Sequence, residues 1–111
     1  MDNPVQHQVK AFNNRNIDAF LKAFSSDVRA ENGSGEEMMS GLDEFRVFYE
    51  NLFNNSPDLH CDIINRTKVG DWVIDEEKLK GLNAEGFPEE AHAVVAYTVN
   101  DGQITFVRMF S

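Results

Sequence analysis

The segment WVIDEEKLKG, residues 72–81, combines strand-forming residues with three consecutive acids. Alternate side chains of an extended strand share one face, so Asp75 and Glu77 point to the same side as Val73 and Leu79. If that side is a pocket with apolar walls, desolvation and like charge push one carboxyl group towards its neutral form. Two carboxyl groups with different pKa values supply an acid and a base. The segment therefore predicts acid–base chemistry by Asp75 and Glu77 on a small molecule.

The preceding segment supplies a cation for this face. Gly70-Asp71 lies between two extended runs and suits a two-residue type II′ hairpin with glycine first. Counting outward from that turn places Arg66 opposite Asp75, where it would hold one carboxylate ionised. The other predicted pairs are Val69–Trp72, Lys68–Val73, Ile64–Glu77 and Asp62–Leu79, with His60 further along the same face. The alternative is a solvent-exposed Arg66–Asp75 ion pair, worth only about 0–1 kcal/mol.

His60 and Cys61 do not form a nucleophile pair, since adjacent strand residues point to opposite faces. Cys61 is expected to be a small buried apolar residue. His7, His60 and His92 show no spacing typical of metal ligands. We expect no metal and no cofactor, although a site assembled from His60, Asp62, Asp75 and Glu77 stays open as an alternative.

Charge and composition restrict the partners. The 111 residues carry a net charge of −9, with ten basic residues scattered among nineteen acids. Phosphate backbones and anionic membranes would be repelled, so no nucleic acid and no membrane partner is expected. No run of about 18 apolar residues is present. One cysteine and no visible signal peptide predict a cytoplasmic protein. The length of 111 residues predicts one domain, residues 1–111.

Helices are predicted in the first half of the chain and strands in the second. Apolar spacing predicts helices over 4–12 and 17–24, and a longer helix over 42–54 that a Ser40–Asp43 capping box would open. Residues 28–32 suit a short strand, and 33–41 suit a loop near a pocket mouth. After Pro57 all segments are extended, and residues 100–102 form a second tight turn. This order predicts an α+β domain with helices on one face of a curved sheet.

The chain resembles the NTF2-like superfamily, in its SnoaL-like and ketosteroid-isomerase-like branches. The resemblance is carried by AFNNRNIDAFLKAFSSDV, MMSGLDEFRVFYENLF, WVIDEEKLKG and YTVNDGQITFVRMF, in this order and spacing. It implies a cystatin-like cone, a curved mixed or antiparallel sheet wrapped around about three N-terminal helices, with an apolar pocket inside. It also implies a homodimer through the outer sheet face, where Trp72, Ile104, Phe106 and Phe110 would lie. The pocket side would carry Val73, Asp75, Glu77, Leu79, Ala93, Val95, Tyr97, Thr105, Val107 and Met109.

The catalytic positions of the steroid isomerases fall at Gln8, Asn32 and Val95 in this chain. An amide cannot abstract a proton near neutral pH, and valine cannot donate a hydrogen bond to an oxyanion. The resemblance therefore implies the isomerase fold without the isomerase site.

Two functions follow. The first is a pocket that binds a small, partly apolar molecule, with isomerase-, cyclase- or hydratase-type chemistry by Asp75 and Glu77. Tyr97 would donate a hydrogen bond, and the predicted ligand-binding residues are Arg66, Tyr97, Val73, Val95, Asn32, His60 and Met109. The alternative is a non-catalytic NTF2-like module for dimerisation or ligand binding.

Overall fold

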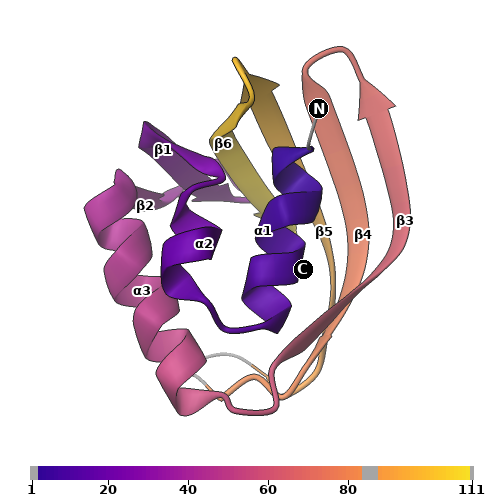
Figure 1. The fold of residues 1–111 in the computed structure, drawn as a ribbon. Helices are drawn as coiled ribbons and strands as arrows, with labels where there is room; N and C mark the ends of the chain where they lie inside the picture. The colour runs from indigo at the N-terminus through magenta and orange to yellow at the C-terminus, as the bar shows by residue number, and fades with distance from the viewer. Residues whose placement is uncertain (1–2, 84–87, 111) are drawn as a thin grey trace.

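A bent mixed sheet curls around three helices in the computed structural model, which describes residues 3–83 and 88–110 (Figure 1). The elements are α1 (Pro4–Asn13), α2 (Ile17–Leu21), β1 (Phe24–Asn32), β2 (Glu37–Ser40), α3 (Leu42–Asn55), β3 (His60–Val69), β4 (Trp72–Lys80), β5 (Ala91–Asn100) and β6 (Gln103–Phe110). The strand order is β2-β1-β6-β5-β4-β3. Strands β1 and β6 run parallel, and the other neighbouring pairs are antiparallel. The predicted α+β cone is confirmed.

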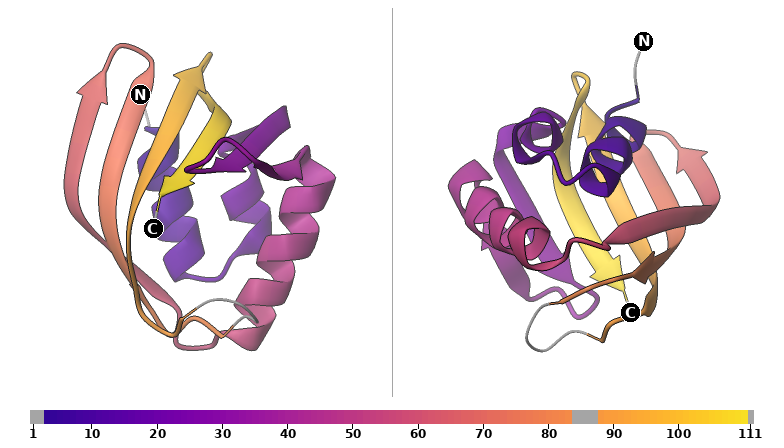
Figure 2. Two further views of the ribbon diagram at one scale, coloured as in Figure 1. Left: turned by 180° about the vertical axis from the view of Figure 1, so that it is seen from behind. Right: turned by 60° about the horizontal axis from the view of Figure 1, so that its bottom comes forward.

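The helices lie on the concave side of the sheet (Figure 2). Their aromatic side chains form much of the core. Phe20 of α2 lies at the centre, with its ring centroid 5.0 Å from that of Phe24 and 4.6 Å from that of Tyr49. Phe45 and Phe53 of α3 complete the group. This packing joins α2 and α3 to the sheet.

Local signals explain where two helices begin. Asn3 caps α1 by accepting a hydrogen bond from the Val5 N–H at 2.9 Å, and Pro4 follows as first helical residue. The predicted Ser40–Asp43 capping box of α3 is wrong. Gly41 is the N-cap, with φ of +85°, and it makes no side-chain cap. The Ser40 N–H instead donates to the Glu44 carboxylate, 2.9 Å away.

The region between α2 and α3 contains more strand than predicted. The helix expected over 17–24 ends at Leu21, because Phe24 opens β1 and pairs with Ile104 of β6. The Ile104 N–H donates to the Ala23 carbonyl at 2.8 Å, which continues this parallel pairing. The segment expected to be only a loop contains β2, which pairs with β1. Tertiary pairing overrides the helical apolar spacing here.

The β3–β4 hairpin confirms the predicted register near its turn and departs from it further along. Val69 pairs with Trp72, and Arg66 pairs with Asp75. A bulge at Ile64 then shifts the pairing by one residue. The predicted pairs Ile64–Glu77 and Asp62–Leu79 are wrong, and the structure has Ile63–Glu77, Asp62–Lys78, Cys61–Leu79 and His60–Lys80. The side of β3 that faces the core therefore carries Cys61 instead of His60 and Asp62.

A second bulge, at Thr105 in β6, corrects one prediction for the outer face. Ile104 pairs with Val99 and Phe106 with Thr98, which leaves Thr105 without an opposite residue. The Thr105 hydroxyl lies 2.8 Å from that of Thr98. Ile104 is fully buried in the core, so it does not belong to the outer face. Val95, Tyr97 and Val107 of the predicted inward set are buried as expected. Ala93, Thr105 and Met109 of that set are only half-buried.

Candidate active site

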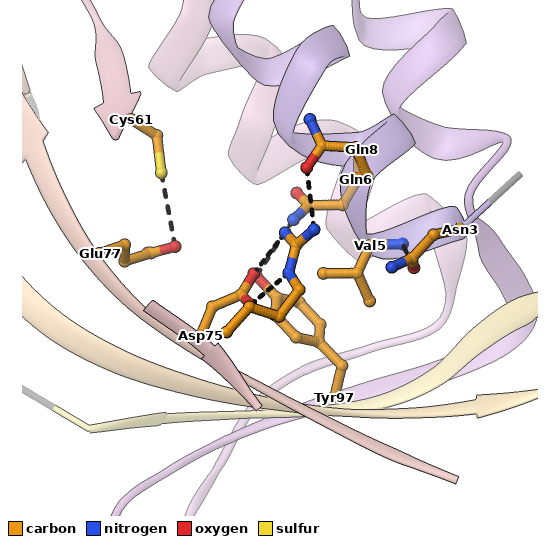
Figure 3. Close-up of polar contacts among 9 residues, drawn as sticks. Asn3, Val5, Gln6, Gln8, Cys61, Asp75, Glu77 and Tyr97 are labelled. Carbon is orange, nitrogen blue, oxygen red and sulfur yellow. Dashed lines mark hydrogen bonds and ion pairs between the residues drawn. The ribbon is translucent and has the colours of Figure 1, made fainter. Parts of the chain in front are cut away.

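Asp75 lies on the concave side of β4, is not exposed to solvent, and is bound by an arginine. Arg66 of β3 donates from Nε to Oδ1 at 2.6 Å and from Nη2 to Oδ2 at 2.9 Å (Figure 3). Its remaining terminal nitrogen, Nη1, donates to the Gln6 side chain of α1 at 2.8 Å. Both carboxylate oxygens and all three guanidinium nitrogens are thus used within the protein. The pair is a bidentate ion pair rather than the exposed alternative.

Tyr97 lies beside this pair in the same buried layer. Its hydroxyl accepts a hydrogen bond from the Gln8 side chain of α1 at 3.1 Å. Burial, with a contribution from the charge of Glu77, raises the pKa of Tyr97 well above its ordinary value. The Gln8–Tyr97 hydrogen bond joins α1 to β5. Tyr97 and Gln8 therefore connect elements of the core.

Glu77 is the second buried acid of β4, and its side chain meets Cys61 of β3 (Figure 3). The Cys61 thiol donates to Oε2 of Glu77 at 3.4 Å. Burial and the nearby Glu77 charge raise the pKa of the thiol, so Cys61 stays protonated and donates. The Ile64 bulge is what brings Cys61 to this position. Glu77 therefore has one neutral hydrogen-bond donor beside it, Cys61, in place of the predicted neighbours His60 and Asp62.

The carboxyl group of Glu77 titrates near neutral pH. Burial raises its pKa from 4.5 to about 7. The Cys61 hydrogen bond and the charge of Arg66 lower the pKa, and the charge of Asp75 raises it. Because Arg66 is paired with Asp75, its charge offsets the effect of burial on Glu77 only in part. The two buried carboxyl groups of β4 therefore have different environments, as the strand pattern predicts.

A cavity of about 360 Å³ opens next to Glu77 and is mostly apolar. Helix α3 contributes Phe48, Tyr49 and Leu52, and the sheet contributes Cys61, Glu77 and Val95. The remaining wall residues are Phe12, Asn32, Met38, Leu79, Leu82, Pro88, Ala91, Ala93, Met109 and Phe110. Its volume falls at the lower end of the range for small-ligand pockets, about 300–1,000 Å³.

The structure brings some of the predicted site residues to this cavity and not others. Glu77, Val95, Asn32 and Met109 lie in its wall. Those that do not line it are Asp75, Arg66, Tyr97, Val73 and His60. Asp75, Tyr97 and Val73 are buried and Arg66 is half-buried, whereas the half-buried His60 is hydrogen-bonded to Asp62 at 2.9 Å. The Asn32 side chain accepts from the Ser34 and Glu36 N–H groups, so it shapes the β1–β2 turn.

Sequence reasoning missed Tyr49 and Cys61 as residues of the site. Tyr49 lies in the cavity wall because of how α3 packs over the sheet, which helical spacing alone does not show. Burial and the charge of Glu77 raise the pKa of its hydroxyl, which is therefore neutral near pH 7. Cys61 could have been placed in the site only if the bulge at Ile64 had been predicted. Isoleucine is not a turn-forming residue, so the sequence does not signal that bulge.

The residues do not suggest a metal centre. Within residues 3–83 and 88–110, no group of three or more His, Cys, Asp and Glu side chains could hold an ion. The alternative set His60, Asp62, Asp75 and Glu77 is divided by the register shift, which leaves His60 and Asp62 outside the concave layer.

The chain belongs to the SnoaL-like domain family, whose model matches residues 5–107. No protein of curated function matches it. Solved structures share the fold: a cystatin-fold protein from Novosphingobium aromaticivorans has a TM-score of 0.88 at 20% identity, covering 100% of this chain and 99% of that one. A ketosteroid-isomerase-like protein from Catenulispora acidiphila, in complex with trimethylamine, gives 0.76 at 18%, covering 100% and 86%. An LEH-like epoxide hydrolase of M. tuberculosis gives 0.76 at 18%, covering 96% and 78%.

None of the described helices has the length and apolar character needed to cross a membrane.

The ion pair predicts a cost for breaking it. Replacing Asp75→Asn leaves the Arg66 guanidinium partly buried without its counter-charge, and should lower the free energy of unfolding by about 3 kcal/mol. The double variant Arg66→Met/Asp75→Leu removes both charges, and should recover most of that loss. Urea unfolding measures both, with Asp62→Asn on the exposed side of β3 as the control. An unchanged stability in Asp75→Asn would contradict the pairing.

The raised pKa of Glu77 predicts how stability depends on pH. Between pH 4.5 and about 7 the unfolded chain releases this proton while the folded protein retains it, so stability falls as pH rises. Glu77→Gln has no proton to release at this position and lacks that decline. Relative to the wild type, the variant should gain about 2 kcal/mol between pH 5 and pH 8. Parallel urea unfolding curves at both pH values test this, and equal pH slopes would show an unshifted Glu77.

Proposed function

We propose that this protein binds a small, largely apolar molecule in the cavity and that Glu77 exchanges a proton with it. The observation that carries the proposal is a buried acid, with a pKa of about 7, in the wall of an apolar cavity. A general acid–base group acts best when its pKa lies near the working pH. At neutral pH about half of the Glu77 side chains are ionised, so both forms are available.

The residues around Glu77 have defined roles in this proposal. Cys61 holds the carboxyl group in place through its thiol hydrogen bond. Tyr49 remains a neutral phenol in the same wall and is placed to donate a hydrogen bond to a bound ligand. Asp75 acts as a positioning residue, because its charge raises the pKa of Glu77 from behind the wall. This differs from the sequence-based hypothesis, in which Asp75 and Tyr97 themselves contacted the ligand.

The proposed reaction class is proton transfer of the kind that isomerases, cyclases and hydratases use. The similar structures include an epoxide hydrolase and a ketosteroid-isomerase-like protein, but at under 25% identity they support the fold alone. The steroid-isomerase positions Gln8, Asn32 and Val95 carry no acid here. If the resemblance assigns those positions correctly, Glu77 differs in position from the acid and base of those enzymes.

A general probe for a desolvated base tests this proposal. With 5-nitrobenzisoxazole, the Glu77 carboxylate takes the C3 proton while the N–O bond breaks, and 2-cyano-4-nitrophenolate is released. The rate above the buffer background should rise with pH and level off above about pH 7, as Glu77 ionises. Glu77→Gln should lower that rate by about 100-fold, the lower end of the range for general-base catalysis. Phenolate absorbance measures it.

The matched control for the probe reaction is Asp62→Asn, which removes an acid that lies outside the cavity. It should retain the wild-type rate. A wild-type protein that does not exceed the buffer background, or a Glu77→Gln variant as fast as the wild type, would contradict proton exchange by Glu77.

A second proposal concerns the outer sheet face, which suits a homodimer interface or a non-catalytic dimerisation module. Trp72, Ile74 and Val94 are each between 37% and 42% exposed there, and Phe106 packs edge-on against Trp72. Phe110, predicted for this face, is 41% exposed and also borders the cavity. An apolar surface of this kind is typical of a protein–protein contact.

The protein is proposed to work in the cytoplasm, where its free thiol stays reduced.

Light scattering after size-exclusion chromatography tests the dimer. The wild type should elute as a dimer at micromolar concentration, and Trp72→Glu should elute as a monomer, because it places a charge in the apolar contact. Val47→Glu, which alters an exposed residue of α3, should remain dimeric. A monomeric wild type would contradict the interface.

A further inference from the structure

The described residues that line the cavity include an acid but no basic side chain. Among the described residues that line it, Glu77 is the one side chain that becomes negative near neutral pH, and none is Lys, Arg or His. The nearest guanidinium, that of Arg66, donates to Asp75 through Nε and Nη2 and to Gln6 through Nη1. A ligand in the cavity therefore meets a carboxylate that has a thiol donor but no paired cation.

The walls are suited to a cation that carries apolar groups. Phe12, Phe48 and Tyr49 present aromatic side chains, and the rings of Phe48 and Tyr49 meet edge-to-face at 5.0 Å. Aromatic faces attract alkylammonium groups, most strongly where water is excluded. Met38 and Met109 add polarizable thioethers that adapt to the shape of a ligand.

We propose that the cavity takes a small organic cation, a substituted ammonium with apolar groups, and that the Glu77 carboxylate is its counter-ion. The inference rests on the proposed function in one respect, namely that the ligand reaches Glu77. An ammonium group compensates the ionised Glu77 where little water can do so. An anionic ligand of the same shape is repelled, and a neutral one leaves the carboxylate unpaired. The net charge of −9 further favours the approach of cations.

The pH dependence of binding separates a cation from a neutral ligand. A permanent cation prefers the ionised form of Glu77, so its affinity rises as the pH passes through 7. A neutral apolar ligand prefers the protonated form, so its affinity falls over the same range. The other groups that face Glu77 from neighbouring elements do not obscure this pH dependence of binding. Cys61, Tyr49 and Tyr97 have raised pKa values and stay neutral, and Asp75 is paired with Arg66.

Three soluble probes of nearly equal shape test the proposal: choline, the neutral 3,3-dimethyl-1-butanol and the anionic 3,3-dimethylbutanoate. Binding is followed by NMR of the methionine methyl groups, since Met38 and Met109 line the cavity and the buried Met39 is an internal control. At pH 8 choline should bind at least tenfold more tightly than the alcohol. Its Kd should fall about tenfold between pH 6 and pH 8, the change in the ionised fraction of a group with a pKa of about 7.

The variants make each outcome decisive. Glu77→Gln should remove the preference for choline and its pH dependence, whereas Asp62→Asn should keep both. If the alcohol or the carboxylate binds as tightly as choline at pH 8, the inference of a cation is wrong. The proposed proton exchange would still stand if the benzisoxazole reaction remained dependent on Glu77. If no probe shifts the Met38 or Met109 signals and the benzisoxazole reaction is also absent, both proposals fail together.

Discussion

The burial of two acids on one face of β4 is the constraint around which the concave side of this protein is organised. A carboxylate away from water needs a cation or several donors, or it takes up a proton. Asp75 and Glu77 follow these two different routes. Asp75 is enclosed by the guanidinium of Arg66, and Glu77 keeps a pKa of about 7 beside one thiol. Because Arg66 can serve only one of them, the second acid remains available to a ligand.

The two routes depend on different parts of the fold. The ion pair sits near the β3–β4 turn, where the register is regular, and Gln6 of α1 holds the outer nitrogen of Arg66. Glu77 lies beyond the bulge at Ile64, where the shifted register turns Cys61 inward. Helix α3 then closes the cavity on the side of Tyr49. The bulge thus separates the ion pair from the residues that line the apolar cavity.

Much of this arrangement could be predicted from the sequence, because it follows from local rules. The alternation of β4 placed Asp75 and Glu77 on one face, and the Gly70-Asp71 turn fixed Arg66 opposite Asp75. The resemblance to NTF2-like proteins indicated the cone and an inward Val95. These inferences use only periodicity, turn chemistry and a family pattern.

The remainder depends on interactions between distant segments. The bulges at Ile64 and Thr105 break the count along β3 and β6, so His60, Asp62 and Ile104 do not lie where simple alternation places them. The end of α2 at Leu21 reflects pairing of Phe24 with β6, which the helical spacing of the sequence does not show. Tyr49 enters the site through the packing of α3. Each of these features can be predicted only when the position of the neighbouring segment in the folded chain is known.

The titration of Glu77 itself tests the central claim most directly. Carboxyl ¹³C NMR of the wild-type protein, with the Glu77 signal assigned through Glu77→Gln, gives the midpoint of this one group. A desolvated carboxyl group in the cavity wall predicts a midpoint near pH 7. A midpoint near 4.5, the ordinary value of an exposed glutamate, would show that water reaches Glu77 freely, and would contradict both the buried acid and the chemistry inferred from it.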